Sequence, residues 1–329
     1  MAVTSQPARD DADGVVAFAA ARARLLSIAY RMLGSMAEAE DVVADVAERW
    51  LRADRDDVES PEAWLVTVTT RRAMDVLRSA RRQRVEYPGV WLPEPVATAD
   101  VPGERLERSE TLTMGMLVLL ERLTPLERAV FVLHDGLGYP HADIAAMLRR
   151  SSAACRQALR RARRHVDRPT DEAVPVERSQ AEAVVGRFLL AAAGGDVDAL
   201  VETLASDVVV LSDGGGVVYA GMRPVCGVRA AARLTANLAR RYAGGDVFPL
   251  ELNGAVGVLG HADGQWAALV FDVDAATELI STVYVVVAPA KLRRLVEAVG
   301  GPAGLPGVDS GAGRFRHRRG RPVDPPPEG

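Results

Sequence analysis

The chain has 329 residues, of which 48% are apolar and 26% charged, and its formal net charge is −4. This composition is that of globular protein and excludes a fibrous or largely disordered chain. The length exceeds that of a typical single domain, so we expect two or three compact units. Because no apolar run is long enough to span a bilayer and the first residues are polar and acidic, we expect a cytoplasmic protein with no membrane partner.

The two cysteines, Cys155 and Cys226, are far apart in the sequence and lie outside any CxxC spacing. They predict neither a disulfide framework nor a zinc site, and we expect no metal and no other cofactor. Free cysteine behaves as a small apolar residue, so we expect both side chains to be buried.

Arginine is concentrated in two blocks. Residues 71–84 contain six arginines, and residues 149–164 contain seven with no acidic residue between them. Two basic stretches in a mildly acidic chain indicate two separate surfaces that contact nucleic-acid phosphates.

The first part of the chain, up to residue 84, is expected to be helical. Apolar residues recur at helical spacing, and Gly34-Ser35 and Ser60-Pro61-Glu62 give the breaks and the start signals between three helices. The first two apolar stripes are Leu25, Ile28, Ala29 and Met32, followed by Val42, Val43, Val46 and Trp50. A proline-rich stretch, 86–103, then predicts a linker or an extended docking segment.

The clearest motif is a helix-turn-helix. Residues 141–148 predict its first helix, 149–151 its turn and 152–166 its second helix. The second helix has an apolar face that includes Cys155 and Leu159, whereas its other face is rich in arginine and carries Gln157. Arginine recognises guanine edges and phosphates, and glutamine recognises adenine, so this partition favours a major-groove recognition helix.

From residue 176 onward the pattern changes to α+β. Helices are expected around 188–193 and 196–204, strands at 207–211, 267–273 and 280–287, and a short helix through Leu292 and Leu295. The Gly-, Pro- and Arg-rich end after Gly300 predicts disorder.

Two segments, 29–51 (AYRMLGSMAEAEDVVADVAERWL) and 60–84 (SPEAWLVTVTTRRAMDVLRSARRQR), closely resemble the second conserved region of extracytoplasmic-function (ECF) sigma factors. The segments ERLTPLERAVFVLHDGLGYPHADIAAML and SSAACRQALRRARRHV resemble the fourth region of the same family. The resemblance implies binding to core RNA polymerase and recognition of promoter DNA at the −10 and −35 elements.

The resemblance also implies roles for individual residues. The acidic second helix would face the β′ subunit of the polymerase through Glu38, Asp41, Asp45 and Glu48. The β and β′ subunits of core RNA polymerase are both expected partners. Contacts to the −10 DNA would come from Arg71, Arg72, Arg78 and Arg81. Contacts to the −35 DNA would come from Ser152, Arg156, Gln157, Arg160, Arg161 and Arg164.

The linker YPGVWLPEP at 87–95 resembles that of the ECF subgroup with a fused C-terminal SnoaL-like domain, and SDGGG and APAKL resemble two motifs of that domain. A regulatory linker and interdomain contact is therefore expected from Trp91, Leu92, Pro93, Glu94, Pro95, Asp213, Gly214, Gly215, Gly216 and Lys291. Trp91 in particular is expected to dock near Asp213–Gly216 and the 288–292 segment. An unknown small ligand in the concave C-terminal fold is a further possible partner.

The expected fold is multidomain: two all-α helical domains, the second a helix-turn-helix, followed by a cone-shaped α+β SnoaL-like domain. The expected boundaries are 15–85 for region 2, 86–105 for the linker, 106–166 for region 4, 167–176 for a second linker, 177–298 for the SnoaL-like domain and 299–329 for a disordered tail.

Two alternatives to a sigma factor regulated by its own third domain remain open. A one-component helix-turn-helix regulator with a ligand-sensing C-terminal domain would leave residues 29–84 unexplained. An enzyme would need an acid/base pair among Asp213, Glu251, His261 and Asp272, whose spacing specifies none. We therefore expect no catalytic activity.

Overall fold

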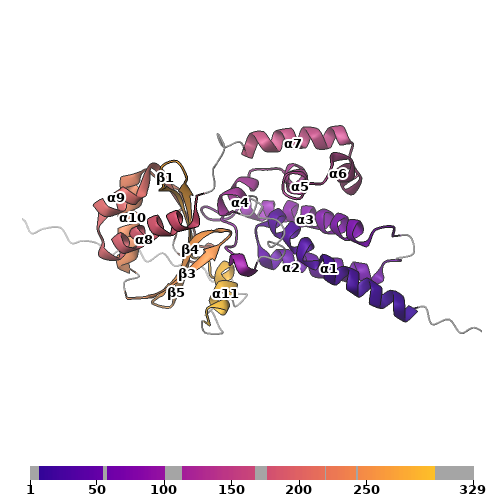
Figure 1. Cartoon of the computed structure of the whole chain (residues 1–329), viewed down its shortest axis with the longest axis horizontal. Coiled ribbons are helices and arrows are strands. Elements are labelled where there is room, and N and C mark those ends of the chain that lie inside the picture. The colour runs from indigo at the N-terminus through magenta and orange to yellow at the C-terminus, as the bar shows by residue number, and fades with distance from the viewer. Residues whose placement is uncertain are drawn as a thin grey trace, which may run out of the picture.

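The computed structural model describes residues 7–54, 58–100, 113–166, 176–218, 220–241 and 244–300. A helical half and an α+β half lie side by side along the long axis of the molecule (Figure 1). Within the ranges just given, no helix combines the length and apolar character needed to cross a bilayer.

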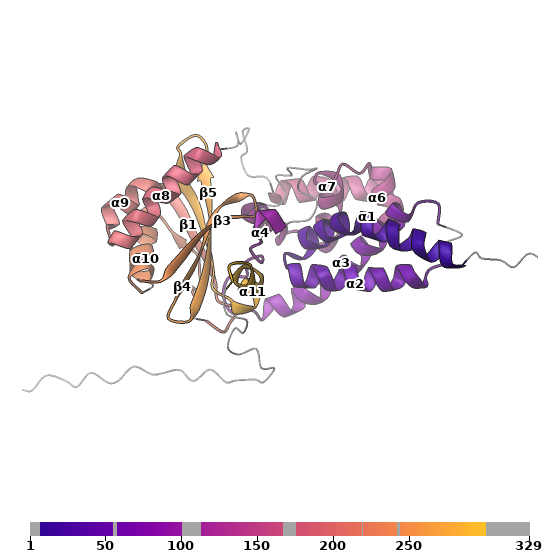
Figure 2. The ribbon, with the colours of Figure 1, turned by 60° about the horizontal axis from the view of Figure 1, so that its bottom comes forward.

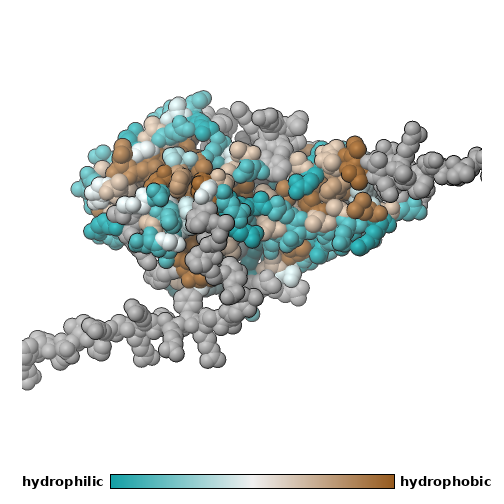
Figure 3. Space-filling view, turned by 90° about the horizontal axis from the view of Figure 1, so that it is seen from below, coloured by the Kyte–Doolittle hydropathy of each residue, from teal (hydrophilic) through white to brown (hydrophobic). Residues whose placement is uncertain are grey.

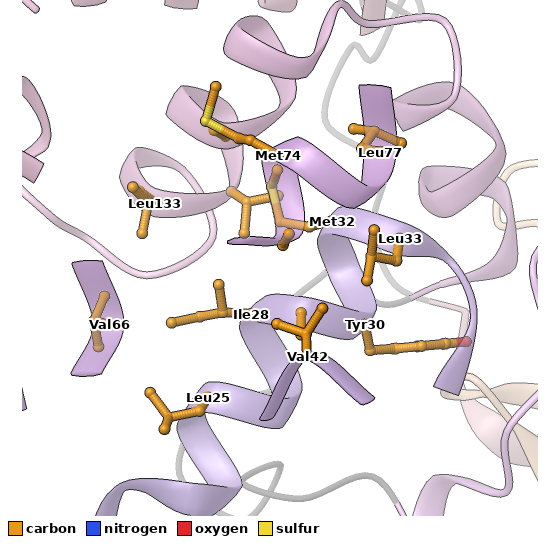
Figure 4. Close-up of a cluster of buried hydrophobic side chains, with 14 of the residues drawn as sticks. Leu25, Ile28, Tyr30, Met32, Leu33, Val42, Val66, Met74, Leu77 and Leu133 are labelled. Atoms are coloured by element: carbon orange, nitrogen blue, oxygen red, sulfur yellow. The ribbon is translucent and has the colours of Figure 1, made fainter. Parts of the chain in front are cut away.

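Three helices form the first unit: α1 (Pro7–Leu33), α2 (Met36–Arg52) and α3 (Pro61–Val85). The predicted break at Gly34-Ser35 is observed, and Ser35 caps α2 by accepting a hydrogen bond from the Glu38 backbone N–H. The two apolar stripes expected from the sequence are buried, and the side chains of α1, α2 and α3 interdigitate in Figure 4. Helical periodicity therefore placed this core correctly.

Four helices form the second unit: α4 (Met114–Leu120), α5 (Pro125–His134), α6 (His141–Leu148) and α7 (Ser152–Val166). A capping box between Thr124 and Glu127 starts α5. The predicted bounds of the helix-turn-helix, 141–148 and 152–166, are those observed. The apolar side chains of both units belong to one continuous core, so the two helical units are packed together.

The C-terminal half contains a six-stranded mixed sheet with strand order β2-β1-β6-β5-β4-β3, in which β1 and β6 pair in parallel and the other neighbours pair antiparallel. Its elements are α8 (Arg178–Gly194), α9 (Val197–Thr203), β1 (Leu204–Asp213), β2 (Val225–Cys226), α10 (Val228–Arg241), β3 (Asp246–Leu252), β4 (Ala255–Ala262), β5 (Gln265–Asp274), β6 (Leu279–Val286) and α11 (Pro289–Ala298). The strands expected at 207–211, 267–273 and 280–287 correspond to β1, β5 and β6.

The two faces of the sheet have different covers. Helices α8, α9 and α10 cover the face turned away from the helical half, where Phe188 and Phe271 pack edge to face at 5.3 Å (Figure 2). Helix α11, Leu92 of the linker and Met114 of α4 cover the opposite face. The helical half is therefore docked on the sheet through both the linker and α4.

One expectation about the cysteines is wrong. Cys155 is buried in α7, whereas Cys226 is exposed. Cys226 lies in β2, a two-residue strand at the edge of the sheet, so its side chain has a neighbouring strand on one side only. The expected linker at 167–176 and the expected tail after 299 fall almost wholly outside the described residues.

Candidate nucleic-acid and polymerase interface

The turn of the helix-turn-helix is tight. Helix α6 ends at Arg149, whose φ of 50° is left-handed, and α7 starts three residues later at Ser152. A side chain in this conformation costs about 1 kcal/mol, which explains why glycine is the residue expected at such a turn. The Arg149 backbone N–H bonds to carbonyls in the last turn of α6, and this satisfies the end of that helix.

Helix α7 separates an apolar face from a basic one. Cys155, Ala158, Leu159 and Ala162 are buried against the rest of the unit. The opposite face is exposed. Gln157, Arg160, Arg161 and Arg164 lie together on it. Arg156 is also exposed, and Ser152 is half-buried at the start of the helix. These donors can reach base edges and phosphates of duplex DNA.

Arg163 has a different role from its neighbours on α7. Its guanidinium donates two hydrogen bonds to the Asp135 carboxylate, at 2.9 and 2.7 Å. Burial alone would raise the pKa of Asp135, but the hydrogen bonds from Arg163 and His134 outweigh it and lower that pKa. The pair fastens α7 to the end of α5 and holds the basic face in a fixed direction.

The acidic residues of α2 are largely engaged in ion pairs. Asp45 pairs with Arg72 at 2.5 Å and with Arg49 at 3.3 Å, and Glu48 pairs with Arg52. Glu38 lies 3.8 Å from Arg84, and burial raises the pKa of Glu38. Asp41 is exposed and forms no ion pair with any described residue. Asp41 is thus an exposed acid on α2 whose charge no described residue neutralises.

The basic residues of α3 also contact protein. Arg71 donates to the carbonyl oxygens of Met147 (2.6 Å) and Ala146 at the end of α6. Arg81 donates to the carbonyl oxygen of Glu121, 3.1 Å away. Arg72 is paired with Asp45 as described above, and Arg78 pairs with Asp75 within α3. In this structure, two of the four arginines expected to contact −10 DNA bind backbone carbonyls of the helix-turn-helix unit.

A half-buried carboxylate joins the two helical units. Glu121, in the turn after α4, accepts hydrogen bonds from Arg84 of α3 and Arg128 of α5, one on each carboxylate oxygen. The Arg128 side chain is 1% exposed, that of Arg84 13% and that of Glu121 18%. Arg128 also donates to the carbonyl oxygen of Arg31 in α1 at 2.9 Å. Without this carboxylate, two guanidinium groups would face each other in a site that excludes most water.

A second carboxylate, Asp213, is buried and joins the linker to the C-terminal domain. It accepts hydrogen bonds from the Tyr87 hydroxyl (2.5 Å), the Leu92 N–H (2.8 Å) and the Gly215 N–H (2.8 Å), and an ion pair from Lys291 at 2.7 Å. Lys291 also donates to the Leu92 carbonyl oxygen. Burial lowers the pKa of Lys291, although the charge of Asp213 opposes that shift. Burial and the hydrogen bond to Asp213 both raise the pKa of Tyr87.

Trp91 lies between two cations from different parts of the chain. The Arg84 guanidinium is 3.5 Å and the Lys291 ammonium 4.1 Å from the centre of its ring. A Cβ at Gly34 would come within 2.8 Å of the Trp91 ring, so any side chain at position 34 would displace the indole. Cation–π contacts of this kind are each worth about 0.5–2 kcal/mol. The geometry thus places Trp91 beside the 288–292 segment, at its junction with α1 and α3.

Glu94 continues the linker contact onto α2. Its carboxylate accepts hydrogen bonds from the Met36 N–H at 2.8 Å and from the Ser35 hydroxyl at 3.1 Å, so the linker caps the start of α2. Burial raises the pKa of Glu94. Pro93 and Pro95, on either side, are buried. The three glycines expected to contribute, Gly214, Gly215 and Gly216, form the turn that follows β1.

The four groups considered for acid/base catalysis have separate partners. Asp213 binds the linker, Glu251 pairs with Arg178, Asp272 accepts from the Tyr284 hydroxyl at 2.7 Å, and His261 stacks on Trp266. Each of these contacts joins different parts of the fold.

Comparison with known families agrees with this geometry. Residues 17–83 match the family described as Sigma-70 region 2, and residues 114–166 match Sigma-70, region 4. The ECF RNA polymerase sigma factor SigJ of Mycobacterium tuberculosis is 41% identical over 234 residues, which span 69% of this chain and 74% of SigJ. The chain is an ECF RNA polymerase sigma factor.

Two further comparisons extend the match. The probable ECF sigma factor SigI of M. tuberculosis is 37% identical over 191 residues, 57% of this chain and 66% of that relative. The crystal structure of M. tuberculosis SigJ superposes with a TM-score of 0.68 at 33% identity, and covers 88% of this chain and 100% of that one. The sigma factor therefore acts in transcription initiation with core RNA polymerase and promoter DNA, and its α+β half belongs to the shared architecture.

Several contacts of this sigma factor were not expected from its sequence. Glu121 and Arg128 join the two helical units, and Arg294 of α11 pairs with Glu40 of α2. Asn253 donates to the Tyr30 hydroxyl at 2.7 Å, and Tyr30 in turn donates to the Glu94 carbonyl oxygen. Only Asn253 carries a local signal, since Asn-Gly is typical of a two-residue hairpin turn. The other residues carry no local signal of their partners.

Proposed function

We propose that this sigma factor directs core polymerase to specific promoters, and that its C-terminal domain controls the spacing of the two DNA-binding units. Helix α2 binds the β′ subunit, α3 contacts the −10 element and α7 enters the major groove of the −35 element. The C-terminal domain acts through the linker, which Asp213 and Lys291 hold against it.

The observation that carries the regulatory part is the contact between α3 and the helix-turn-helix. Elements centred near −10 and −35 are separated by about 25 base pairs, or ~85 Å of B-form DNA at 3.4 Å per base pair. Arg71 of α3 is hydrogen-bonded directly to the end of α6, so in this arrangement the two units cannot reach both elements. Promoter binding requires region 4 to leave α3, which also releases Arg71 and Arg81 for DNA.

Run-off transcription tests the proposal. Core polymerase plus the full chain is presented with a panel of promoter fragments, and initiation that depends on the chain supports it. DNA binding without initiation would instead support the one-component regulator. That alternative does not account for the match of residues 17–83 to Sigma-70 region 2.

Recognition of the −35 element is expected to depend on Arg156 and Arg160. Replacing each by alanine removes a bidentate donor to a base edge, which is expected to cost about 1–3 kcal/mol and to relax sequence preference. Arg164→Ala is the matched control, because it is expected to lower affinity equally for all sequences by removing a phosphate-binding group. Binding to a set of single-base promoter variants measures this, and unchanged selectivity in the Arg156 and Arg160 variants contradicts the assignment.

Capture of the polymerase is expected to depend on the acidic face of α2. Asp41→Lys is expected to weaken co-purification with core polymerase by about tenfold or more, because it reverses an accessible charge, and to leave DNA binding by the free chain unchanged. Asp41 is preferred to Asp45, whose reversal would also break its bond to Arg72. Asp198→Lys, on the exposed surface of α9, is the control for net charge. Capture of the Asp41 variant at the wild-type level would refute the prediction.

A further inference from the structure

Helix α10 carries an arginine stripe that none of the functions above uses. Arg229, Arg233 and Arg240 are exposed, together with Asn237. At 3.6 residues per turn, the three arginines fall within an arc of about 40° and extend over about 16 Å along the helix. Three alanines of the same helix, Ala231, Ala232 and Ala236, are buried in the core of the C-terminal domain.

The stripe has no neutralising partner among the described residues. Arg233 donates to the carbonyl oxygen of Arg229 and Arg240 to the Asn237 side chain, and none of the three arginines forms an ion pair there. By contrast, the exposed Arg178 on α8 of the same domain pairs with both Glu182 and Glu251. The charge of the stripe is thus left available to a partner.

The surrounding sequence is free of acid. Residues 214–245 contain five arginines and no aspartate or glutamate, although the whole chain has 44 acidic residues in 329. Figures 1 and 2 place α10 on the face of the sheet turned away from the helical half, so this basic surface points outward. Figure 3 shows one face of the molecule as a mosaic of hydrophilic and hydrophobic side chains.

We propose that the α10 arginine stripe (Arg229, Arg233 and Arg240) binds the phosphate backbone of duplex DNA beside the promoter elements. The proposal rests on the proposed function, which brings DNA to this chain. Arginine forks match phosphate oxygens, so the three arginines offer one fork each to the phosphates of the DNA backbone. A flat stripe with one polar amide offers no apolar pocket, which disfavours a peptide partner.

The contact between α4 and the sheet keeps the C-terminal domain, and with it the stripe, near the −35 DNA. Met114 is buried with residues of β5 and β6, and a Cβ at Gly115 would come within 2.7 Å of the Asp272 carboxylate and 3.0 Å of the Tyr284 hydroxyl. Region 4 thus begins in close contact with the C-terminal domain. The C-terminal domain also contacts region 2 through Arg294 and Asn253, so the stripe stays near promoter DNA when the bonds between α3 and region 4 break.

The salt dependence of DNA binding tests the proposal. The full-length chain is titrated with a long duplex of random sequence between 50 and 200 mM salt, and the slope of log K against log salt is measured. The triple variant Arg229→Gln, Arg233→Gln, Arg240→Gln removes three phosphate-binding groups and is expected to reduce that slope by about 2.7, at about 0.9 for each phosphate. Core-polymerase capture and promoter preference are expected to stay at wild-type values. Glutamine keeps the helix propensity of α10.

The control is a triple variant with the same net charge, Arg178→Gln, Arg187→Gln, Arg293→Gln, which removes exposed arginines elsewhere in the domain. A wild-type slope in the α10 variant, or an equal fall in the control, would overturn the proposal. A loss of polymerase capture with an unchanged DNA slope would also overturn it, because the partner would then be protein. Failure of the sigma role itself is separate, since it would appear as no initiation by the wild-type chain.

Discussion

Glu121→Gln is expected to open the contact between the two helical units without unfolding either one. The amide keeps the shape of the side chain but removes the negative charge that Arg84 and Arg128 share. Breaking a buried ion pair by removing one partner costs about 3–5 kcal/mol, because the remaining charge stays buried. Separation of the two helical units returns both guanidinium groups to water. The cost therefore shifts the equilibrium between packed and separated units toward the separated form by about a hundredfold or more.

Small-angle scattering and DNA affinity measure this opening. The variant is expected to show a larger radius of gyration than the wild-type chain and tighter binding to a duplex that carries both promoter elements, because Arg71 and Arg81 are released. Glu62→Gln is the control, since Glu62 pairs with Arg24 at the surface and such pairs contribute about 0–1 kcal/mol. An unchanged radius together with unchanged affinity would show that Glu121 does not hold the units together.

Asp213→Ala is expected to release the linker from the C-terminal domain. The substitution leaves Lys291 charged and nearly buried and removes the acceptor for Tyr87, Leu92 and Gly215. The uncompensated charge alone is expected to cost about 3–5 kcal/mol, and each unsatisfied donor adds about 1 kcal/mol or more. Trp91, whose ring contacts Lys291, is expected to become exposed along with the linker.

Limited chymotrypsin digestion after Trp91 reports the release, with cleavage expected to be at least about tenfold faster than in the wild-type chain. Asp207→Ala is the matched control, because Asp207 is an exposed residue of the same strand. The pair Asp213→Asn with Lys291→Met is expected to be milder than either single change, since it leaves no lone charge. Equal cleavage of Asp213→Ala and wild type would contradict the role of this carboxylate.

Local patterns predicted most of the helical half. The apolar stripe from Leu25 to Met32, the break at Gly34-Ser35 and the turn at Arg149 each depend on residues a few positions apart. Helix caps and amphipathic faces are governed by such short spacings, so one sequence suffices to locate them. The division of α7 into a buried and a basic face follows for the same reason. Cys226 escaped prediction because exposure at a sheet edge depends on the strand order.

The tertiary structure alone decided which charges meet. The sequence by itself determined that α2 is acidic, that α3 and α7 are basic and that the linker is stiff. It did not determine that Arg71 and Arg81 bind carbonyls of region 4, or that one carboxylate, Glu121, joins Arg84 to Arg128. These partners are separated by 7 to 76 positions along the chain, and a long charged side chain gives no local sign of its partner. Burial makes such pairs energetically important, and burial depends on how the three parts pack.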